Sequence, residues 1–293
     1  MKDQDENKDK GLSVNEKLMY TTTRIETVDS SGKRYSGTGF FYGIQSKTNP
    51  SNLSVWVLTN KHVIDGMKSI SICLSQAGDD GKPLLKEPLK CVIENVNFII
   101  RHPGPDVDLC AIPASLFVNS LIQAGHNPFY QLFSSKIIPS AEEMKELDSI
   151  EQITMIGYPE GLWDAKHNLP LVRNGITSTP VYVDHNGKEE FLIDAACYHG
   201  SSGSPVILLN NGSYTNKYGD TFFGANRVYL LGILSQGPLE TIYGEIEIKD
   251  QPEIKSPIRA KVKIPTNLGL VIKSSRILEL EEVIRKTIPV LDK

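Results

Sequence analysis

The sequence contains no long hydrophobic run. No stretch of its 293 residues approaches the roughly 20 apolar residues that a membrane-spanning helix requires. The first residues, MKDQDENKDKG, are charged and lack the apolar core of a secretory signal. We therefore expect no membrane association and a cytoplasmic location, with a disordered tail over residues 1–14.

Cysteines and clustered metal ligands are also scarce. The four cysteines are far apart and show no C-x-x-C spacing, and the six histidines show no metal-binding spacing. In a chain without an export signal such cysteines are most often reduced and buried. We therefore expect no disulfide, no metal and no other cofactor. Basic residues form no stripe and the net charge is −4, which argues against a nucleic-acid partner.

The sequence does contain a succession of short strand-like runs. About a dozen segments rich in Val, Ile, Tyr, Phe and Thr are separated by Gly, Pro, Asn or Asp clusters, as in GTGFFYGI, VWVLTN and RVYLLGIL. The long helices that alternate with strands in a parallel α/β sheet are missing. This pattern predicts an all-β sandwich or barrel architecture.

Three segments with helical patterns interrupt the strands. Residues 113–125 begin with Pro and end with Gly, and Ser140 with Glu143 forms a capping-box pattern. Near the C-terminus, a 3.6-residue period gives SSRILELEEVIRKTI one apolar stripe. The chain then divides into strand groups over 15–135 and 151–272, a linker over 136–150 and a C-terminal helix over 273–293.

Three short stretches carry residues that could perform acyl transfer. His62 follows the apolar run VWVLTN, Asp108 precedes the run LCAI, and Ser202 lies within CYHGSSGSPVIL. A serine hydroxyl becomes a nucleophile when an imidazole accepts its proton, and a carboxylate behind the imidazole fixes its tautomer. Each residue alone is more often a turn or surface residue. The three together, in the order His, Asp, Ser on an all-β background, are more specific.

The combination resembles the chymotrypsin-like (trypsin-fold) serine proteases, through TNKHV around His62, DLCAI around Asp108 and GSSGSP around Ser202. IGYPEG and the serine segment are most similar to the bacterial trypsin-like branch, which includes the high-temperature-requirement proteases. The resemblance implies two six-stranded antiparallel β-barrels and a C-terminal helix. It implies a serine endopeptidase that hydrolyses protein or peptide substrates, with Ser202 as nucleophile, His62 as general base and Asp108 as orienting carboxylate.

The same resemblance implies the binding groups around the nucleophile. The backbone N–H groups of Gly200 and Ser202 would form the oxyanion hole. An extended substrate would pair with the main chain of residues 235–237. Ala196 would lie at the base of the primary specificity pocket, where a residue that is not acidic favours a small or medium apolar side chain. His199 would line the cleft or be an exposed turn residue. The implied substrate-binding residues are Ala196, His199, Ser235, Gln236 and Gly237.

Alternatives remain for the residues and for the function. Ser201 and Ser204 compete with Ser202 as nucleophile, and Asp106 competes with Asp108, although the family patterns favour Ser202 and Asp108. Ser201 stands where trypsin-type enzymes have an Asp that captures a newly cut N-terminus, so we expect no such zymogen switch. A catalytically silent binding or scaffold protein on the same fold is the alternative function. Because an unregulated cytoplasmic protease would be harmful, we also expect a regulatory protein partner.

Overall fold

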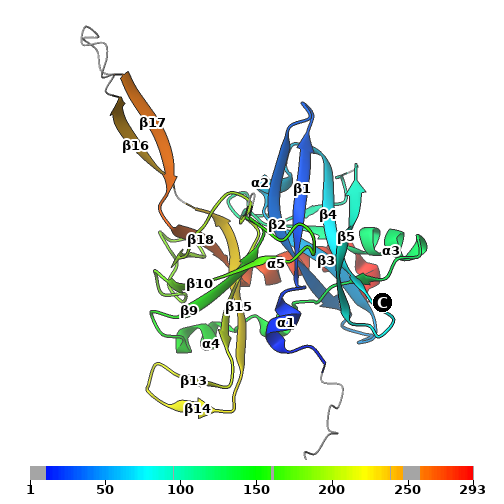
Figure 1. Cartoon of the computed structure of the whole chain (residues 1–293). Helices are drawn as coiled ribbons and strands as arrows, with labels where there is room; N and C mark the ends of the chain where they lie inside the picture. The colour runs from blue at the N-terminus through cyan, green and yellow to red at the C-terminus, as the bar shows by residue number, and fades with distance from the viewer. Residues whose placement is uncertain (1–10, 95, 160–161, 238, 247–257, 293) are drawn as a thin grey trace, which may run out of the picture.

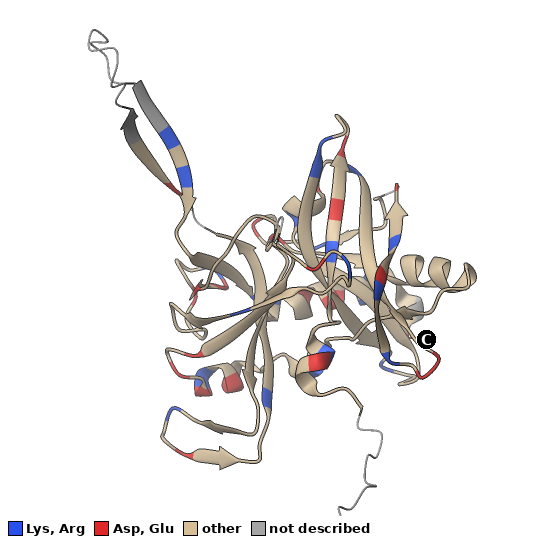
Figure 2. Cartoon of the chain, viewed as in Figure 1, with Lys and Arg blue, Asp and Glu red and all other residues tan. Residues whose placement is uncertain are grey.

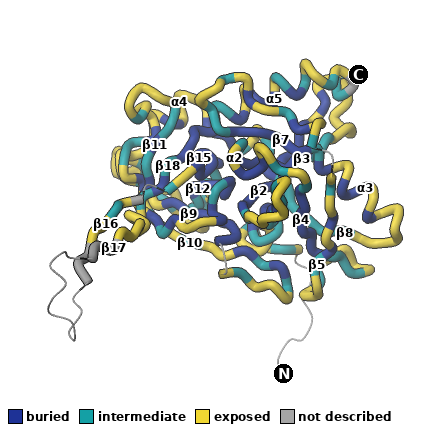
Figure 3. Tube along the Cα trace, turned by 90° about the horizontal axis from the view of Figure 1, so that it is seen from above, coloured by how far each residue is buried: buried dark blue, intermediate teal, exposed yellow. Residues whose placement is uncertain are grey.

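The computed structural model describes residues 11–94, 96–159, 162–237, 239–246 and 258–292. Two β-rich halves stand side by side, with the N-terminal half in blue to cyan and the C-terminal half in green to orange (Figure 1). Each half encloses an apolar cluster. A third cluster includes residues of both halves, among them Phe40, Trp56 and Ile233. Seen from above, buried residues fill both halves and the region where they meet (Figure 3).

The N-terminal half is an eight-stranded antiparallel sheet with the strand order β5-β4-β1-β2-β3-β7-β6, and β8 pairs with β4. The central strand β2 is buried along most of its length, because its apolar residues face both the sheet's own core and the cluster shared with the other half. The strands are β1 Thr22–Asp29, β2 Arg34–Gln45, β3 Leu53–Thr59, β4 Met67–Ala77, β5 Pro83–Ile93, β6 Ile100–Arg101, β7 Cys110–Pro113 and β8 Pro128–Phe129.

This sheet differs from the six-stranded barrel that the family resemblance implies. Within the described ranges its two ends, β5 and β6, do not pair with each other, so the sheet is not closed. The short length of β6 explains the opening, since it comprises Ile100–Arg101 alone and both residues pair with β7. The N–H of the next residue, His102, still donates to the carbonyl of Leu109 at 2.9 Å, and Pro103 then follows. Proline lacks the N–H that would extend a strand ladder.

The C-terminal half contains the closed six-stranded antiparallel barrel that was expected, with the strand order β10-β11-β18-β15-β12-β9. Its apolar side chains alternate inward, as in Phe191 and Ile193 of β11, which are fully buried. The barrel strands are β9 Gln152–Gly157, β10 Leu171–Thr177, β11 Glu190–Asp194, β12 Pro205–Asn210, β15 Arg227–Gln236 and β18 Leu268–Lys273.

Two hairpins extend from the barrel. The pair β13 Ser213–Thr215 and β14 Thr221–Phe223 connects β12 to β15, and the pair β16 Leu239–Ile246 and β17 Ile258–Pro265 connects β15 to β18. The second hairpin projects away from the body (Figure 1). Charged residues of both signs are interspersed over the described parts of the chain (Figure 2). This distribution fits the small net charge of −4.

The described helices are short, except for α3 with nine residues and α5 with thirteen. Ser140 and Glu143 form the expected capping box at the start of α4, and α5 buries Ile277, Leu280 and Ile284 along its apolar stripe. No helix in the described chain is long and apolar enough to span a membrane. The helices are α1 Val14–Leu18, α2 Lys61–Ile64, α3 Ser115–Gln123, α4 Ala141–Glu146 and α5 Ser275–Thr287, with 3₁₀ turns at Ser135–Ile137 and Pro289–Asp292.

The expected disordered tail over residues 1–14 includes Ser13 and Val14, which belong to the cap and first residue of α1. Residues 1–10 lie outside the described residues. Ser13 caps α1 through a capping box with Glu16, so helix formation begins at Val14. The charged composition hid this signal, because Ser13 and Glu16 have the S-x-x-E spacing that favours a helix start.

Candidate active site

His62 and Asp108 meet because β3 pairs with β7. The register places the last residue of β3, Thr59, opposite Cys110. His62, in α2, therefore lies beside Asp108, just before β7. The carboxylate accepts two hydrogen bonds from this histidine, one from the backbone N–H at 3.0 Å and one from Nδ1 at 2.6 Å. Asp106 is exposed and makes neither contact.

Further groups fix the carboxylate of Asp108. The hydroxyl of Ser235 donates to its Oδ2 at 3.0 Å, and the Asn60 side chain donates to its backbone carbonyl at 2.8 Å. Burial alone would raise the pKa of Asp108, but the hydrogen bonds and charge of His62, with the Ser235 hydroxyl, hold it below its usual value. An ionised carboxylate only accepts hydrogen bonds, so Nδ1 of His62 carries the proton and Nε2 can act as a base.

Ser202 lies on a turn that two glycines make possible. Gly200 and Gly203 have φ values of +84° and +88°, a region that glycine adopts without strain. A Cβ at Gly203 would lie 1.9 Å from the carbonyl oxygen of Thr38. The N–H of Gly203 donates to Leu234 of β15 at 2.8 Å. The turn is therefore held tightly against both halves of the molecule.

Thr38 of β2 makes most of the contacts from the N-terminal half. Its N–H donates to the carbonyl of Ser202 at 2.8 Å, and its hydroxyl donates to the carbonyl of Gly200 at 2.8 Å. The same hydroxyl accepts from the N–H of Tyr158 at 2.9 Å. Its carbonyl accepts from the hydroxyl of Thr59 at 2.7 Å. These bonds hold two carbonyl groups of the serine turn, those of Gly200 and Ser202, against β2.

The N–H groups of Gly200 and Ser202 are left unused. Among the described residues neither donates a hydrogen bond within the protein, whereas the N–H groups of Ser201, Gly203 and Ser204 all do. Likewise no hydrogen bond joins Nε2 of His62 to the hydroxyl of Ser202 in the part of the chain that the structure describes. The structure thus pairs His62 with Asp108, but it does not bring Ser202 into that hydrogen-bonded pair.

The implied substrate-binding residues fall into two groups. Ser235 is buried and contacts Asp108, while Gln236 is exposed at the end of β15 and pairs with Leu270. Gly237 lies beside the second group, Ala196 and His199 of the serine segment, since a Cβ on Gly237 would be 3.2 Å from Cβ of Cys197. Ala196 is half-buried and His199 is exposed.

A cavity lies away from the implied site residues, and the described residues hold no metal-ligand cluster. A cavity of about 740 Å³ lies between α1 and the barrel, lined by residues such as Leu18, Ile153 and Val172, and contains none of the implied site residues. The described residues contain no group of three His, Cys, Asp or Glu side chains that could hold a metal ion. All four cysteines are free and buried.

The family is decided by a sequence comparison. A model of the trypsin-like peptidase domain matches residues 37–213, which include His62, Asp108 and Ser202. The chain belongs to the trypsin-like peptidase family. The trypsin-like match ends before residues 235–237, so it does not cover the implied substrate strand. No curated protein matches the chain in sequence.

Several solved structures are similar to this trypsin-like chain at low identity. The HtrA-type protease AlgW with a tripeptide is 16% identical with a TM-score of 0.43, and the match covers 92% of this chain and 61% of that one. The active form of the Rv3671c protease from M. tuberculosis is 15% identical with a TM-score of 0.40, covering 89% and 78%. The scabies mite inactivated protease paralogue S-I1 is 14% identical with a TM-score of 0.42, covering 92% and 97%. This chain thus spans less than two thirds of the AlgW chain.

Sequence reasoning missed two residues of this trypsin-like site. Thr38 lies in GTGFF, where two glycines flank a polar residue inside an apolar strand. Arg173 is the charged residue within the strand LVRNGIT, and it contacts Ala196 and Ser201. A polar residue in a buried strand such as β2 is a usable signal, because it needs a partner, whereas the strand of Arg173 is mostly exposed and gives no such signal. The partner itself depends on the fold.

Proposed function

We propose that the protein is a serine endopeptidase that hydrolyses peptide bonds through His62, Asp108 and Ser202. The supporting observation is the combination of a His62–Asp108 pair joined by two hydrogen bonds with a serine turn that has two unused N–H groups. Gly200 is buried, and a purely structural turn would normally satisfy a buried N–H group within the protein. Membership of the trypsin-like peptidase family supports the same reaction class.

The reaction would proceed through an acyl-enzyme. Oγ of Ser202 attacks the scissile carbonyl carbon while Nε2 of His62 accepts the hydroxyl proton. The N–H groups of Gly200 and Ser202 donate to the oxyanion that forms. The intermediate collapses when His62 returns the proton to the leaving amine. Water then attacks the acyl group, again with His62 as base, and Ser202 regains its proton. Asp108 stabilises the imidazolium throughout.

Binding of an extended substrate would use the main chain of residues 235–237. The end of β15 is suited to this role, because Gln236 is exposed and precedes the half-buried Gly237. Added strands of this kind bind through backbone hydrogen bonds, and side-chain pockets give the specificity. Ala196 at the pocket base would favour a small or medium apolar side chain.

A fluorophosphonate probe tests the proposal. The wild type should be labelled covalently and Ser202→Ala should not, because the probe reacts with an activated serine hydroxyl. Ser204→Ala is the matched control. Ser204 is fully buried, and its hydroxyl has no partner among the described residues, so this variant should label like the wild type.

Two outcomes would contradict the endopeptidase proposal. Equal labelling of wild type and Ser202→Ala would remove Ser202 as nucleophile. An unlabelled wild type that binds peptides equally well with and without Ser202→Ala would favour the silent binding or scaffold protein instead. We also propose control by a protein partner in the cytoplasm. Labelling that is the same with and without cell extract would count against such control.

A further inference from the structure

Arg173 reaches from β10 to the loop that carries the nucleophile. One of its terminal nitrogens donates to the backbone carbonyl of Ala196, and the same nitrogen donates to the hydroxyl of Ser201 at 3.3 Å. Its guanidinium carbon lies 5.4 Å from the ring centre of Tyr198. All three partners belong to the segment 196–202, so a single side chain contacts this loop near its start, in its middle and just before Ser202.

The charge of Arg173 has no carboxylate partner in the described chain. The side chain is half-buried, and this burial lowers the pKa of its guanidinium. Other partly buried arginines are paired: Arg227 contacts Glu151 at 3.4 Å and Arg285 contacts Glu281 at 2.6 Å. Burying a cation without an anion is unfavourable unless hydrogen bonds offset the lost hydration. Among the described residues, the acceptors of Arg173 are on the nucleophile loop.

These contacts complement those made by Thr38. Thr38 approaches from the N-terminal half and binds the carbonyl groups of Gly200 and Ser202. Arg173 approaches from the barrel and binds the residue between them, Ser201, whose side chain is 1% exposed. The loop is therefore held from both halves, through the carbonyl groups of Gly200 and Ser202 and through the side chain of Ser201.

We propose that Arg173 is a positioning residue that keeps the loop in the conformation that directs the N–H groups of Gly200 and Ser202 toward the oxyanion. It acts on the loop through the hydroxyl of Ser201 and the carbonyl of Ala196. The inference rests on the proposed endopeptidase function. It also gives Ser201 a role. The neutral hydroxyl of Ser201 accepts a hydrogen bond from the guanidinium of Arg173, a cation that the chain already contains, so no cleavage is needed to create a positive charge.

Arg173→Met tests the inference, with Arg227→Met as the control. Both arginines are partly buried, extend from barrel strands and contact a tyrosine ring, since Arg227 lies 4.4 Å from the ring of Tyr214. The fluorophosphonate labelling kinetics separate the inactivation rate constant, kinact, from the binding constant, KI. The oxyanion hole acts mainly in the transition state. Arg173→Met should therefore lower kinact by about 10–100-fold, where the upper value approaches the effect of losing one oxyanion-hole donor. KI should remain nearly unchanged.

Two further measurements separate positioning from general destabilisation. Hydrogen exchange of the peptide covering residues 196–203 should speed up in Arg173→Met and stay as in the wild type in Arg227→Met. Millimolar guanidinium chloride should restore part of kinact in Arg173→Ala, because it can refill the space with the same planar donor. Arg173→Lys should recover less than the wild type, since an ammonium cannot reproduce the geometry of the guanidinium.

The outcomes distinguish this inference from the proposed function. A labelled wild type with a slow Arg173→Met, rapid local exchange and guanidinium rescue supports it. A labelled wild type in which Arg173→Met and Arg227→Met have the same kinact overturns the inference and leaves the function standing. A wild type that is not labelled overturns the proposed function and the inference with it.

Discussion

Replacing Thr38 with valine tests how much the fold and the site depend on one hydroxyl group. Thr38 is fully buried, and valine has nearly its shape. The change removes the donor for the Gly200 carbonyl at 2.8 Å and the acceptor for the Tyr158 N–H at 2.9 Å. The backbone bonds of Thr38 to Ser202 and Thr59 do not involve the hydroxyl, so the variant can retain the fold.

The structure gives the expected size of the effect. Thr38→Val leaves a buried carbonyl and a buried N–H unpaired, and each unsatisfied group costs about 1–3 kcal/mol. The free energy of unfolding should therefore fall by about 2–6 kcal/mol. For a chain of this size, that corresponds to a decrease of roughly 4–24 °C in Tm. Because the Gly200 carbonyl loses its partner, kinact for the fluorophosphonate should fall as well, by about 10-fold or more.

Thr27→Val is the matched control for this prediction. Thr27 is also fully buried in the N-terminal sheet, but its hydroxyl has no hydrogen-bond partner among the described residues. Replacing an unpaired buried hydroxyl with a methyl group is close to neutral or stabilising. Urea denaturation of both variants and the wild type gives the comparison. If Thr38→Val is no less stable and no slower to label than Thr27→Val, the reasoning about these two bonds is wrong.

Two further variants test the site. Asp108→Asn should lower kcat by about 10⁴-fold, because the amide favours the wrong tautomer of His62. The folded-state pKa of Asp108 is lowered. Its ionised carboxylate therefore stabilises the fold above the unfolded pKa of about 3.9, and this stabilisation is lost as pH falls through the folded value. Asp108→Asn should make the acid side of the stability profile less steep, and an unchanged slope would contradict this. Gly203→Ala should abolish soluble folded protein, because its Cβ would lie 1.9 Å from the Thr38 carbonyl oxygen. The control Gly212→Ala has a similar φ of +86° and nothing within 4 Å of its Cβ, so it should cost only about 1–2 kcal/mol of stability. Equal thermal stability of the two variants would refute the steric argument.

Local sequence signals predicted the parts of the fold that depend on near neighbours. The capping box at Ser140 and the apolar stripe of α5 are present as expected, because both involve residues three or four positions apart. The open N-terminal sheet was not predicted. Its cause is the shortness of β6, which ends where Pro103 and Pro105 prevent further pairing. A family pattern describes which strands exist, but the length of each strand is set by such local breaks.

The contacts of the site were harder to predict, because they join residues far apart in the chain. The hydroxyl of Thr38 meets the carbonyl of Gly200 across 162 positions, and Arg173 meets Ser201 across 28. Both contacts depend on strand register and on how the two halves pack. The sequence marks each of these side chains only as a polar residue within a strand, and it says nothing about the acceptor.

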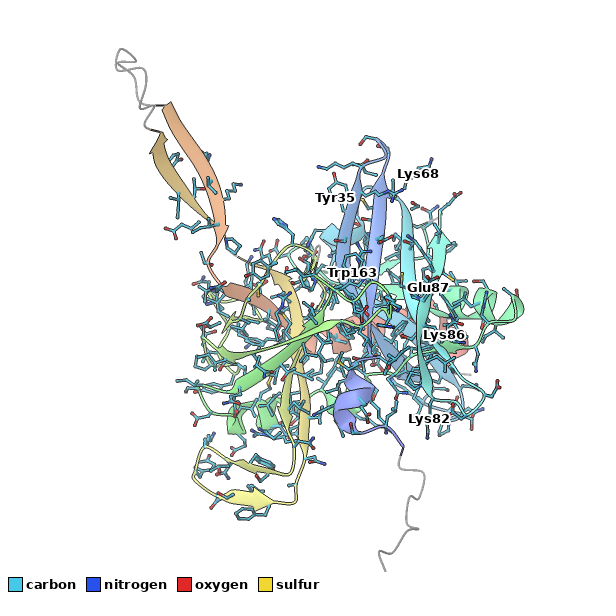
Figure 4. The ribbon with its side chains drawn as sticks, in the orientation of Figure 1. Tyr35, Lys68, Lys82, Lys86, Glu87 and Trp163 are labelled. Carbon is cyan, nitrogen blue, oxygen red and sulfur yellow. The ribbon has the colours of Figure 1, made fainter. Side chains whose placement is uncertain are left out.

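Non-covalent contacts join the two halves of the molecule, and some of them also form the site. All four cysteines are free, so no disulfide fixes one half to the other. Beyond the shared apolar cluster, Arg24 of β1 lies 3.8 Å from the ring centre of Trp163, whose position between the halves is visible in Figure 4. Thr38 adds its hydrogen bonds to the serine turn. A displacement of one half against the other must therefore stretch the bonds that hold Gly200 and Ser202, so the packing of the halves and the geometry of the proposed oxyanion hole cannot vary independently.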